Sequence, residues 1–185
     1  DYLNRIRGAA QRMAQLIDDL LELSHVGRFE LHRAPVSVTD VATQIIQSLK
    51  RSEPGRIVTA DVDPELTVDA DAALLGILLD HLIGNAWKFS SNQTNAHIWV
   101  SGAMLGGSPA IQVADNGAGF DPTYAEKIFG PFQRSHAEMD YPGTGIGLAI
   151  VQRIVARHSG RIVAEGSPDQ GASFTFTLSP ATDTE

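Results

Sequence analysis

The chain of 185 residues lacks cysteine, which excludes disulfide bonds and thiolate metal sites and leaves the compartment open. It also lacks a long hydrophobic run, because the longest one, residues 72–79, is too short to span a lipid bilayer. No signal peptide is visible. Positive charge is scarce: 14 Lys and Arg stand against 22 Asp and Glu, a formal net charge of -8. An acidic surface gains nothing from counterion release, so we expect no nucleic acid partner and no direct membrane contact.

Apolar residues make up 43% of the chain, enough for a buried core in one domain with an appendage. Residues 2–26 are predicted to be a helix, and Leu16 and Leu23 widen its apolar stripe as in a helix bundle. The stripe itself repeats every three or four positions, as in a coiled-coil seam, at Leu3, Ile6, Ala10, Met13, Ile17 and Leu20. Such a helix needs partner helices from another segment or a second chain. The alternative is a helix that packs on its own domain.

From residue 37 onward the pattern predicts a mixed domain of helices and strands. Ser37 or Thr39 can cap a helix that runs to about residue 50, and Asp69 or Asp71 can cap a longer helix that ends near Phe89. The other expected elements are a linker with a short strand at 28–36, two short strands within 55–71, a hairpin at 96–117, a short helix at 124–128, a helix ending near 158 and a hairpin at 161–180. This order predicts an α+β fold, with a mixed sheet covered on one face by helices.

Three glycines at alternate positions, Gly143, Gly145 and Gly147, run directly into an apolar helical pattern. Their spacing matches neither a P-loop nor the dinucleotide-binding fingerprint, and no strand precedes them. What remains is a flexible loop whose backbone amides lead into a helix N-terminus, which is a good site for an anion such as phosphate. The alternative is a glycine-rich turn that serves only close packing.

A polar face is predicted on the helix that ends near Phe89. His81, Asn85 and Lys88 fall at positions i, i+4 and i+7, beside apolar neighbours. A carboxamide oxygen suits Mg²⁺ that keeps some of its waters and takes other oxygens from a triphosphate. Lys88 adds a mobile positive charge for the same phosphates. The alternative is an ordinary exposed helix face.

Asp115 stands at the end of a predicted strand and is followed by Gly117 and Gly119. An ionised carboxylate only accepts hydrogen bonds, so a buried one would select a base with an exocyclic amine, adenine rather than guanine. The same residues could instead form a simple turn.

A stretch rich in turn formers begins after Phe129 and Phe132 and leads to the glycines. Loops of this kind in compact domains are usually functional lids. Arg134, near its start, could bind phosphate through both ends of its guanidinium group.

Four segments occur in order: HLIGNAWKF (81–89), DNGAGF (115–120), FGPFQR (129–134) and GTGIGLA (143–149). Together they resemble the N box, the first glycine box, the F box and the second glycine box of bacterial sensor histidine kinases, especially PAS- and phytochrome-linked members. The resemblance implies a GHKL (Bergerat) ATPase fold, a two-layer α/β sandwich preceded by one long bundle-type helix. It also implies a domain division: the second helix of a dimerisation and phosphotransfer hairpin at 1–27, a linker at 28–36, an ATP-binding catalytic domain at 37–180 and a tail at 181–185.

The resemblance further implies roles for individual residues. ATP and Mg²⁺ would be the cofactors, with Asn85 as the metal ligand and His81, Asn85 and Lys88 as the catalytic group. The nucleotide would be bound by Asn85, Lys88, Phe89, Asp115, Gly117, Gly119, Phe129, Arg134, Gly143, Thr144, Gly145, Gly147 and Leu148. The implied partners are a phosphoacceptor helix, the receiver domain of a response regulator and a second copy of the parent protein. The implied location is the cytoplasm, whether or not the parent is anchored in a membrane.

The chain departs from the family pattern at His81. Many members have Asn there, and hydrolytic relatives have a Glu that activates water. Without a carboxylate at this position we expect slow intrinsic ATP hydrolysis. His81 could serve as a base or support a ligand, although a structural role is favoured.

A second departure is an absence. None of the six histidines is followed by the acidic residue and Arg-x-Pro that mark the family's phosphoacceptor. We therefore expect this chain to transfer the γ-phosphate of ATP to a histidine on a helix that it does not contain. Two alternatives stay open: a serine kinase or ATPase of the same superfamily, and a non-catalytic nucleotide-binding signalling module.

Overall fold

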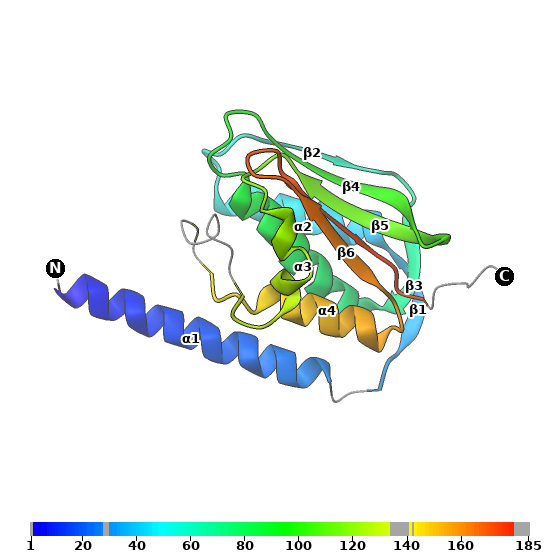
Figure 1. The fold of residues 1–185 in the computed structure, drawn as a ribbon, viewed down its shortest axis with the longest axis horizontal. Helices are drawn as coiled ribbons and strands as arrows, with labels where there is room; N and C mark the ends of the chain where they lie inside the picture. Colours follow the sequence, from blue (N-terminus) through cyan, green and yellow to red (C-terminus); the bar gives the residue numbers. More distant parts are fainter. Residues whose placement is uncertain (1, 28–29, 134–140, 142, 180–185) are drawn as a thin grey trace.

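The computed structural model describes residues 2–27, 30–133, 141 and 143–179. Its centre is a five-stranded mixed sheet in the order β2-β4-β5-β7-β6. These strands are β2 (Val58–Val62), β4 (Ala96–Leu105), β5 (Ser108–Asp115), β6 (Ile162–Gly166) and β7 (Ala172–Phe176). Figure 1 shows the helices gathered on one face of the sheet. The predicted α+β fold is thus confirmed.

Two helices that cover the sheet begin at predicted capping residues. The Ser37 side chain accepts a hydrogen bond from the Asp40 amide at the start of α2 (Val38–Ser52). The Asp71 carboxylate accepts from the amides of Ala73 and Leu74 at the start of α3 (Ala72–Phe89). α3 supplies much of the core, with Leu75, Leu78, Leu79, Leu82, Ile83, Ala86 and Trp87 buried. This burial fixes the rotation of α3 and therefore the direction of its polar face.

The hairpin of β4 and β5 turns at Gly106 and Gly107, whose φ values of 57° and 78° require glycine. The short helix predicted at 124–128 is instead two single 3₁₀ turns, η1 (Pro122–Tyr124) and η2 (Lys127–Phe129). Pro122 favours such a short turn because it opens the segment without an amide proton. α4 (Gly147–Arg157) follows the glycines, as expected.

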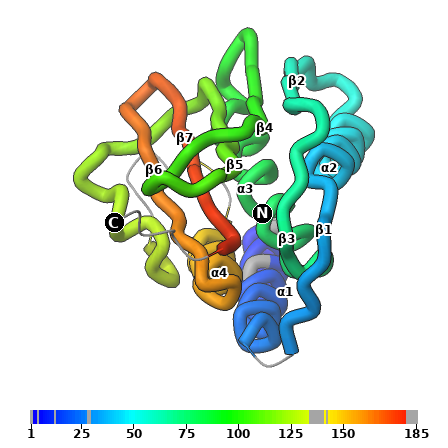
Figure 2. Tube along the Cα trace, turned by 90° about the vertical axis from the view of Figure 1, so that its right-hand side faces the viewer, coloured from blue at the N-terminus to red at the C-terminus, as the bar shows by residue number. Residues whose placement is uncertain are grey.

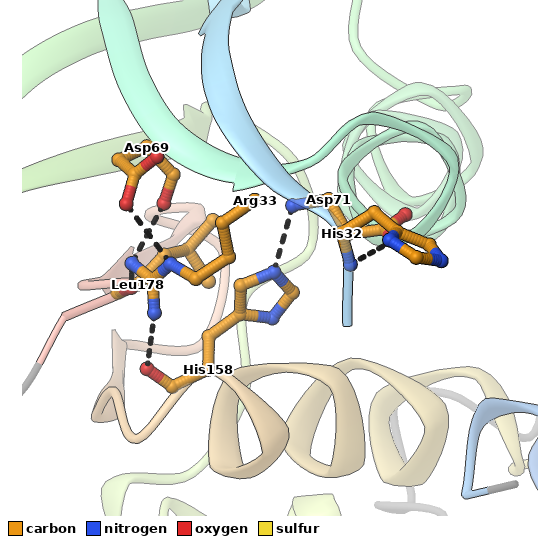
Figure 3. A network of polar contacts seen from close by, with 6 residues as sticks. All are labelled: His32, Arg33, Asp69, Asp71, His158 and Leu178. Atoms are coloured by element: carbon orange, nitrogen blue, oxygen red, sulfur yellow. Dashed lines mark hydrogen bonds and ion pairs between the residues drawn. The ribbon is translucent and has the colours of Figure 1, made fainter. Parts of the chain in front are cut away.

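The strand expected within residues 28–36 forms a small sheet of its own. β1 (Arg33–Ser37) pairs antiparallel with β3 (Thr67–Asp71), and Figure 2 shows the two side by side. Arg33 extends this connection, because its guanidinium group donates to the carbonyl oxygens of His158 and Leu178 (Figure 3). The chain that follows the first helix is therefore tied to both the start of α3 and the end of α4.

The first helix, α1 (Tyr2–Val26), lies along α4 on the side away from the sheet (Figures 1 and 2). Leu16, Leu23 and Val26 pack against the core of the domain. The predicted seam stays largely exposed, from Leu3 at 82% to Leu20 at 46%. One side of α1 therefore packs on its own domain while another side, which carries the predicted seam, is exposed. In the described part of the chain, no helix has the length and apolar character needed to cross a membrane.

Candidate functional site

The polar face of α3 lines a cavity of about 240 Å³. Facing it are residues 143–147, here called the glycine segment, and the first turn of α4. The predicted residues that the structure brings together here are His81, Asn85, Lys88, Phe89, Gly143, Thr144, Gly145, Gly147 and Leu148. Pockets for whole ligands usually measure about 300–1,000 Å³, so this volume suits the phosphate end of a nucleotide.

The glycine segment approaches α3 closely. A β-carbon on Gly143 would lie 3.2 Å from Lys88 Nζ, and one on Gly147 would lie 2.9 Å from His81 Nδ1. Gly145 has a φ of 76°, and its carbonyl oxygen accepts a 2.8 Å hydrogen bond from the Phe132 amide. A side chain at Gly143 or Gly147 would require the side chain of Lys88 or His81 to move, and the positive φ of Gly145 favours glycine.

The N-terminus of α4 is open to a ligand. Its cap residue is Ile146, which has no side chain able to accept from the first amides of the helix. These amides and the helix dipole favour an anion at this end. A lysine and a helix N-terminus therefore line the same small cavity.

Asn85 is the candidate metal ligand of this cavity. Its side chain is partly buried and, within the residues that the structure describes, makes no hydrogen bond. The described residues also hold no group of three or more His, Cys, Asp or Glu able to bind a metal. A carboxamide oxygen alone fits Mg²⁺ only if a triphosphate and water supply the other ligands.

Asp115 lies outside the lining of this cavity, at the buried end of β5. The residue is 7% exposed, and its Oδ1 accepts a 2.8 Å hydrogen bond from the Gly117 amide. Burial raises the pKa of Asp115 to about 6, although hydrogen bonds from the amides of Gly117 and Ala172 oppose this. The carboxylate is therefore ionised at pH 7 but close to its titration range.

Glycines surround Asp115 because the backbone is crowded there. A β-carbon on Gly117 would lie 2.4 Å from the carbonyl oxygen of Phe89, and one on Gly119 would lie 1.9 Å from that of Ser167. Phe89 also lines the cavity, so the end of β5 adjoins the cavity at this residue. Phe129 does not line the cavity, because it packs into the core against Phe174. Arg134 lies outside the described residues.

Helix α1 contributes contacts that reasoning from the sequence missed. Gln15 and Asp19 line the cavity, and the Thr144 hydroxyl donates a hydrogen bond to Asp19. One turn further on, Glu22 Oε2 lies 2.9 Å from His81 Nε2. A signal was present, since residues 15, 19 and 22 repeat the spacing of residues 81, 85 and 88.

A buried histidine joins the two helices that form the cavity (Figure 3). The ring of His158 is fully buried; Nδ1 lies 2.8 Å from the Ile154 carbonyl oxygen, and Nε2 lies 3.1 Å from the amide of Asp71. The neutral ring must therefore donate from Nδ1 and accept at Nε2. Burial is the main cause that lowers the pKa of His158. The end of α4 is thus held against the start of α3.

The sequence matches the family of histidine kinase-, DNA gyrase B- and HSP90-like ATPases over residues 70–182. This is more than half of the chain, so the chain belongs to that family of ATP-binding domains. Within the family it is homologous to sensor histidine kinases, in agreement with the four ordered segments.

Individual relatives support this placement. Cyanobacterial phytochrome A of a Nostoc species is 36% identical over 168 residues, which cover 90% of this chain. The solved structure of full-length ShkA in complex with AMPPNP has a TM-score of 0.73 at 28% identity and covers 95% of this chain. The complex of histidine kinase ThkA with response regulator TrrA has a TM-score of 0.70 at 21% identity, which shows a shared fold. The chain spans 22% of the phytochrome and 37% of ShkA.

Proposed function

We propose that this chain is the catalytic domain of a cytoplasmic two-component sensor histidine kinase, which binds Mg²⁺ and ATP and presents the γ-phosphate to a histidine on a helix outside the chain. The convergence of Asn85, Lys88 and the glycine segment on one cavity carries the proposal. Phosphoryl transfer needs mainly position and charge neutralisation, which these groups can supply. The attacking imidazole needs little activation near pH 7.

The phosphate end of ATP would lie against Lys88 and the open N-terminus of α4, with Gly143, Thr144, Gly145 and Gly147 providing close backbone contacts. Asn85 would hold Mg²⁺, which supplies charge neutralisation when it is bound. Lys88 Nζ already lies 4.2 Å from the Phe89 ring centroid, at the side of the cavity that adjoins β5. This contact supports a position of Lys88 between the proposed phosphate and base regions.

The adenine would lie beyond Phe89, where Asp115 would accept a hydrogen bond from its exocyclic amine, and Gly117 and Gly119 let the backbone pack closely around this carboxylate. Leu148 would contact the nucleotide from α4. Phe129 would support this region from the core, and Arg134 would reach phosphate from the lid. Burial of Asp115 and its acceptor-only chemistry support this assignment.

The exposed seam of α1 supports the proposed partner helix and second copy. Residues 1–27 would be one helix of a dimerisation hairpin, 28–36 the linker, 37–180 the catalytic domain and 181–185 the tail. The missing acceptor helix and a second copy would cover Leu3, Ile6 and Met13, which are all more than half exposed. A response regulator receiver domain would then accept the phosphate, by analogy with ThkA, which forms a complex with the response regulator TrrA.

The test has two stages. Calorimetric titration with ATP and GTP, with and without Mg²⁺, should give tighter binding of ATP that Mg²⁺ strengthens in the wild type and not in Asn85→Ala. Addition of an acceptor hairpin and labelled ATP should then give an acid-labile phosphoprotein. Binding without transfer would favour a nucleotide-binding signalling module, and an acid-stable label would favour a serine kinase.

A further inference from the structure

Glu22 and His81 form a carboxylate–imidazole pair at the edge of the cavity. Glu22 comes from α1 and His81 from α3, and Oε2 lies 2.9 Å from Nε2. An ionised carboxylate can only accept, so a neutral His81 ring would donate from Nε2 to Glu22 and keep a lone pair on Nδ1. α1 thereby sets the tautomer of a histidine that belongs to another element.

The second ring nitrogen of His81, Nδ1, lies close to Gly147 at the start of α4. Nδ1 is the His81 atom nearest to the position that a β-carbon on Gly147 would occupy, 2.9 Å away, and both residues line the cavity. Within the described residues, the ring has no hydrogen-bond partner other than Glu22. A basic nitrogen held by a carboxylate thus faces the place where Gly147 begins α4.

We propose that this pair is a general base that makes the domain hydrolyse ATP when α1 is docked, a second activity that rests on the proposed binding of ATP. A water between Nδ1 and the γ-phosphorus attacks the phosphorus and gives its proton to Nδ1. The bond from the γ-phosphorus to the bridging oxygen breaks, and that oxygen leaves with the electron pair on ADP. Glu22 stabilises the imidazolium ion, which then releases the proton to solvent.

The pair changes one expectation from the sequence. Slow hydrolysis was expected because position 81 carries no carboxylate, but the fold supplies one from position 22. Because Glu22 lies on α1, the base is complete only while α1 lies against α3. The bond between Thr144 and Asp19, on the same side of α1, holds the helix in this position. Docking of α1 would therefore direct the γ-phosphate to water, and release of α1 would leave it available for transfer.

The chain contains a matched control pair. His97 Nε2 lies 2.7 Å from Asp61 Oδ2, but neither residue lines the cavity. Phosphate release from ATP should fall about tenfold or more in Glu22→Gln and about a hundredfold in His81→Asn, at the lower end of the range for a general base. Asp61→Asn should release phosphate at the wild-type rate. Calorimetric affinity for ATP should stay within about twofold in all three variants.

A measurement without nucleotide tests the geometry itself. In ¹H–¹⁵N spectra of the free protein, the His81 Nε2 proton should be visible in the wild type, shielded from exchange by Glu22, and lost in Glu22→Ala. Circular dichroism checks that the variants fold. If the wild-type chain did not bind ATP in calorimetry, the proposed function itself would be overturned.

Two results would overturn the hydrolysis proposal alone. The first is equal phosphate release in the wild type, Glu22→Gln and His81→Asn, while ATP binding and phosphoryl transfer to an added hairpin are normal. The second is an acid-labile label on the chain itself that disappears in His81→Asn, since the imidazole would then attack in place of water.

Discussion

The hydroxyl of Thr144 donates a hydrogen bond to the carboxylate of Asp19, across 125 positions of the sequence. Gln15 Nε2 donates to the other oxygen of the same carboxylate at 2.8 Å. A helix at the start of the chain is thus joined to the segment that borders the proposed triphosphate site. The position of α1 and the position of the glycine segment are therefore linked through Asp19.

Asp19→Asn should tighten ATP binding. The substitution removes a negative charge from the wall of the cavity and keeps a side chain that can bond to Thr144. Asp19 is only 9% exposed, and we expect up to about fivefold tighter binding at low salt, which corresponds to about 1 kcal/mol. Calorimetry at two salt concentrations measures the effect, which should shrink as salt increases.

Asp18→Asn is the control for this prediction, because Asp18 lies next to Asp19 on α1 but does not line the cavity. It should leave the affinity nearly unchanged. Equal tightening in both variants would mean that only the net charge of the protein matters.

Local patterns were enough to predict most of the helices and hairpins. A short acceptor before an apolar helical run satisfies free amides, which predicts Asp69 or Asp71 as the cap, and the structure shows that it is Asp71. His81, Asn85 and Lys88 were grouped by helical spacing, which tertiary packing then aimed at the cavity. Their ligand roles stay predictions.

Contacts between distant segments could not be predicted. The pairing of β1 with β3 and the contact between Glu22 and His81 join segments far apart in the sequence, and local spacing does not say which segments meet. The two 3₁₀ turns replaced one helix because a five-residue segment gains too few helical bonds to offset nucleation.

Affinity for ATP should depend on pH through Asp115. Its pKa of about 6 means that the carboxylate can accept from adenine at pH 7 and is largely protonated at pH 5. We expect about tenfold weaker binding per pH unit below 6. The measurement is a series of ATP titrations from pH 5 to 8. In Asp115→Asn the affinity should be weaker than in the wild type at pH 7 and above, and the decline of affinity below pH 6 should be absent. An unchanged decline in the variant would place the adenine elsewhere.

Gly171→Ala should destabilise the domain strongly. Gly171 has a φ of 83°, and a β-carbon there would lie 1.9 Å from the backbone oxygen of Asp115. Strain and displacement of two strands should lower the free energy of unfolding by at least about 3 kcal/mol. Urea denaturation measures it. Gly76→Ala is the contrasting variant, because Gly76 lies in α3 and a β-carbon there would have no neighbour within 4 Å. Alanine at this position should raise the free energy of unfolding by about 1 kcal/mol.

Acid should destabilise the domain through His158. Its pKa is lowered, first by burial, and a second proton would replace the acceptor that Nε2 offers to the Asp71 amide. The unfolded chain binds that proton near pH 6.5 and the native state only at lower pH. The contribution to stability is therefore complete above about pH 6.5 and is lost as pH falls from there toward the native pKa.

The free energy of unfolding, measured by urea denaturation from pH 5 to 8, should show this decline in the wild type. The profile should be flatter in His158→Gln, because glutamine can keep one donor and one acceptor. His32→Gln, with an exposed side chain in the same region, should follow the wild type. Parallel profiles for the wild type and His158→Gln would contradict the role assigned to the buried ring, because the decline would then come from other groups.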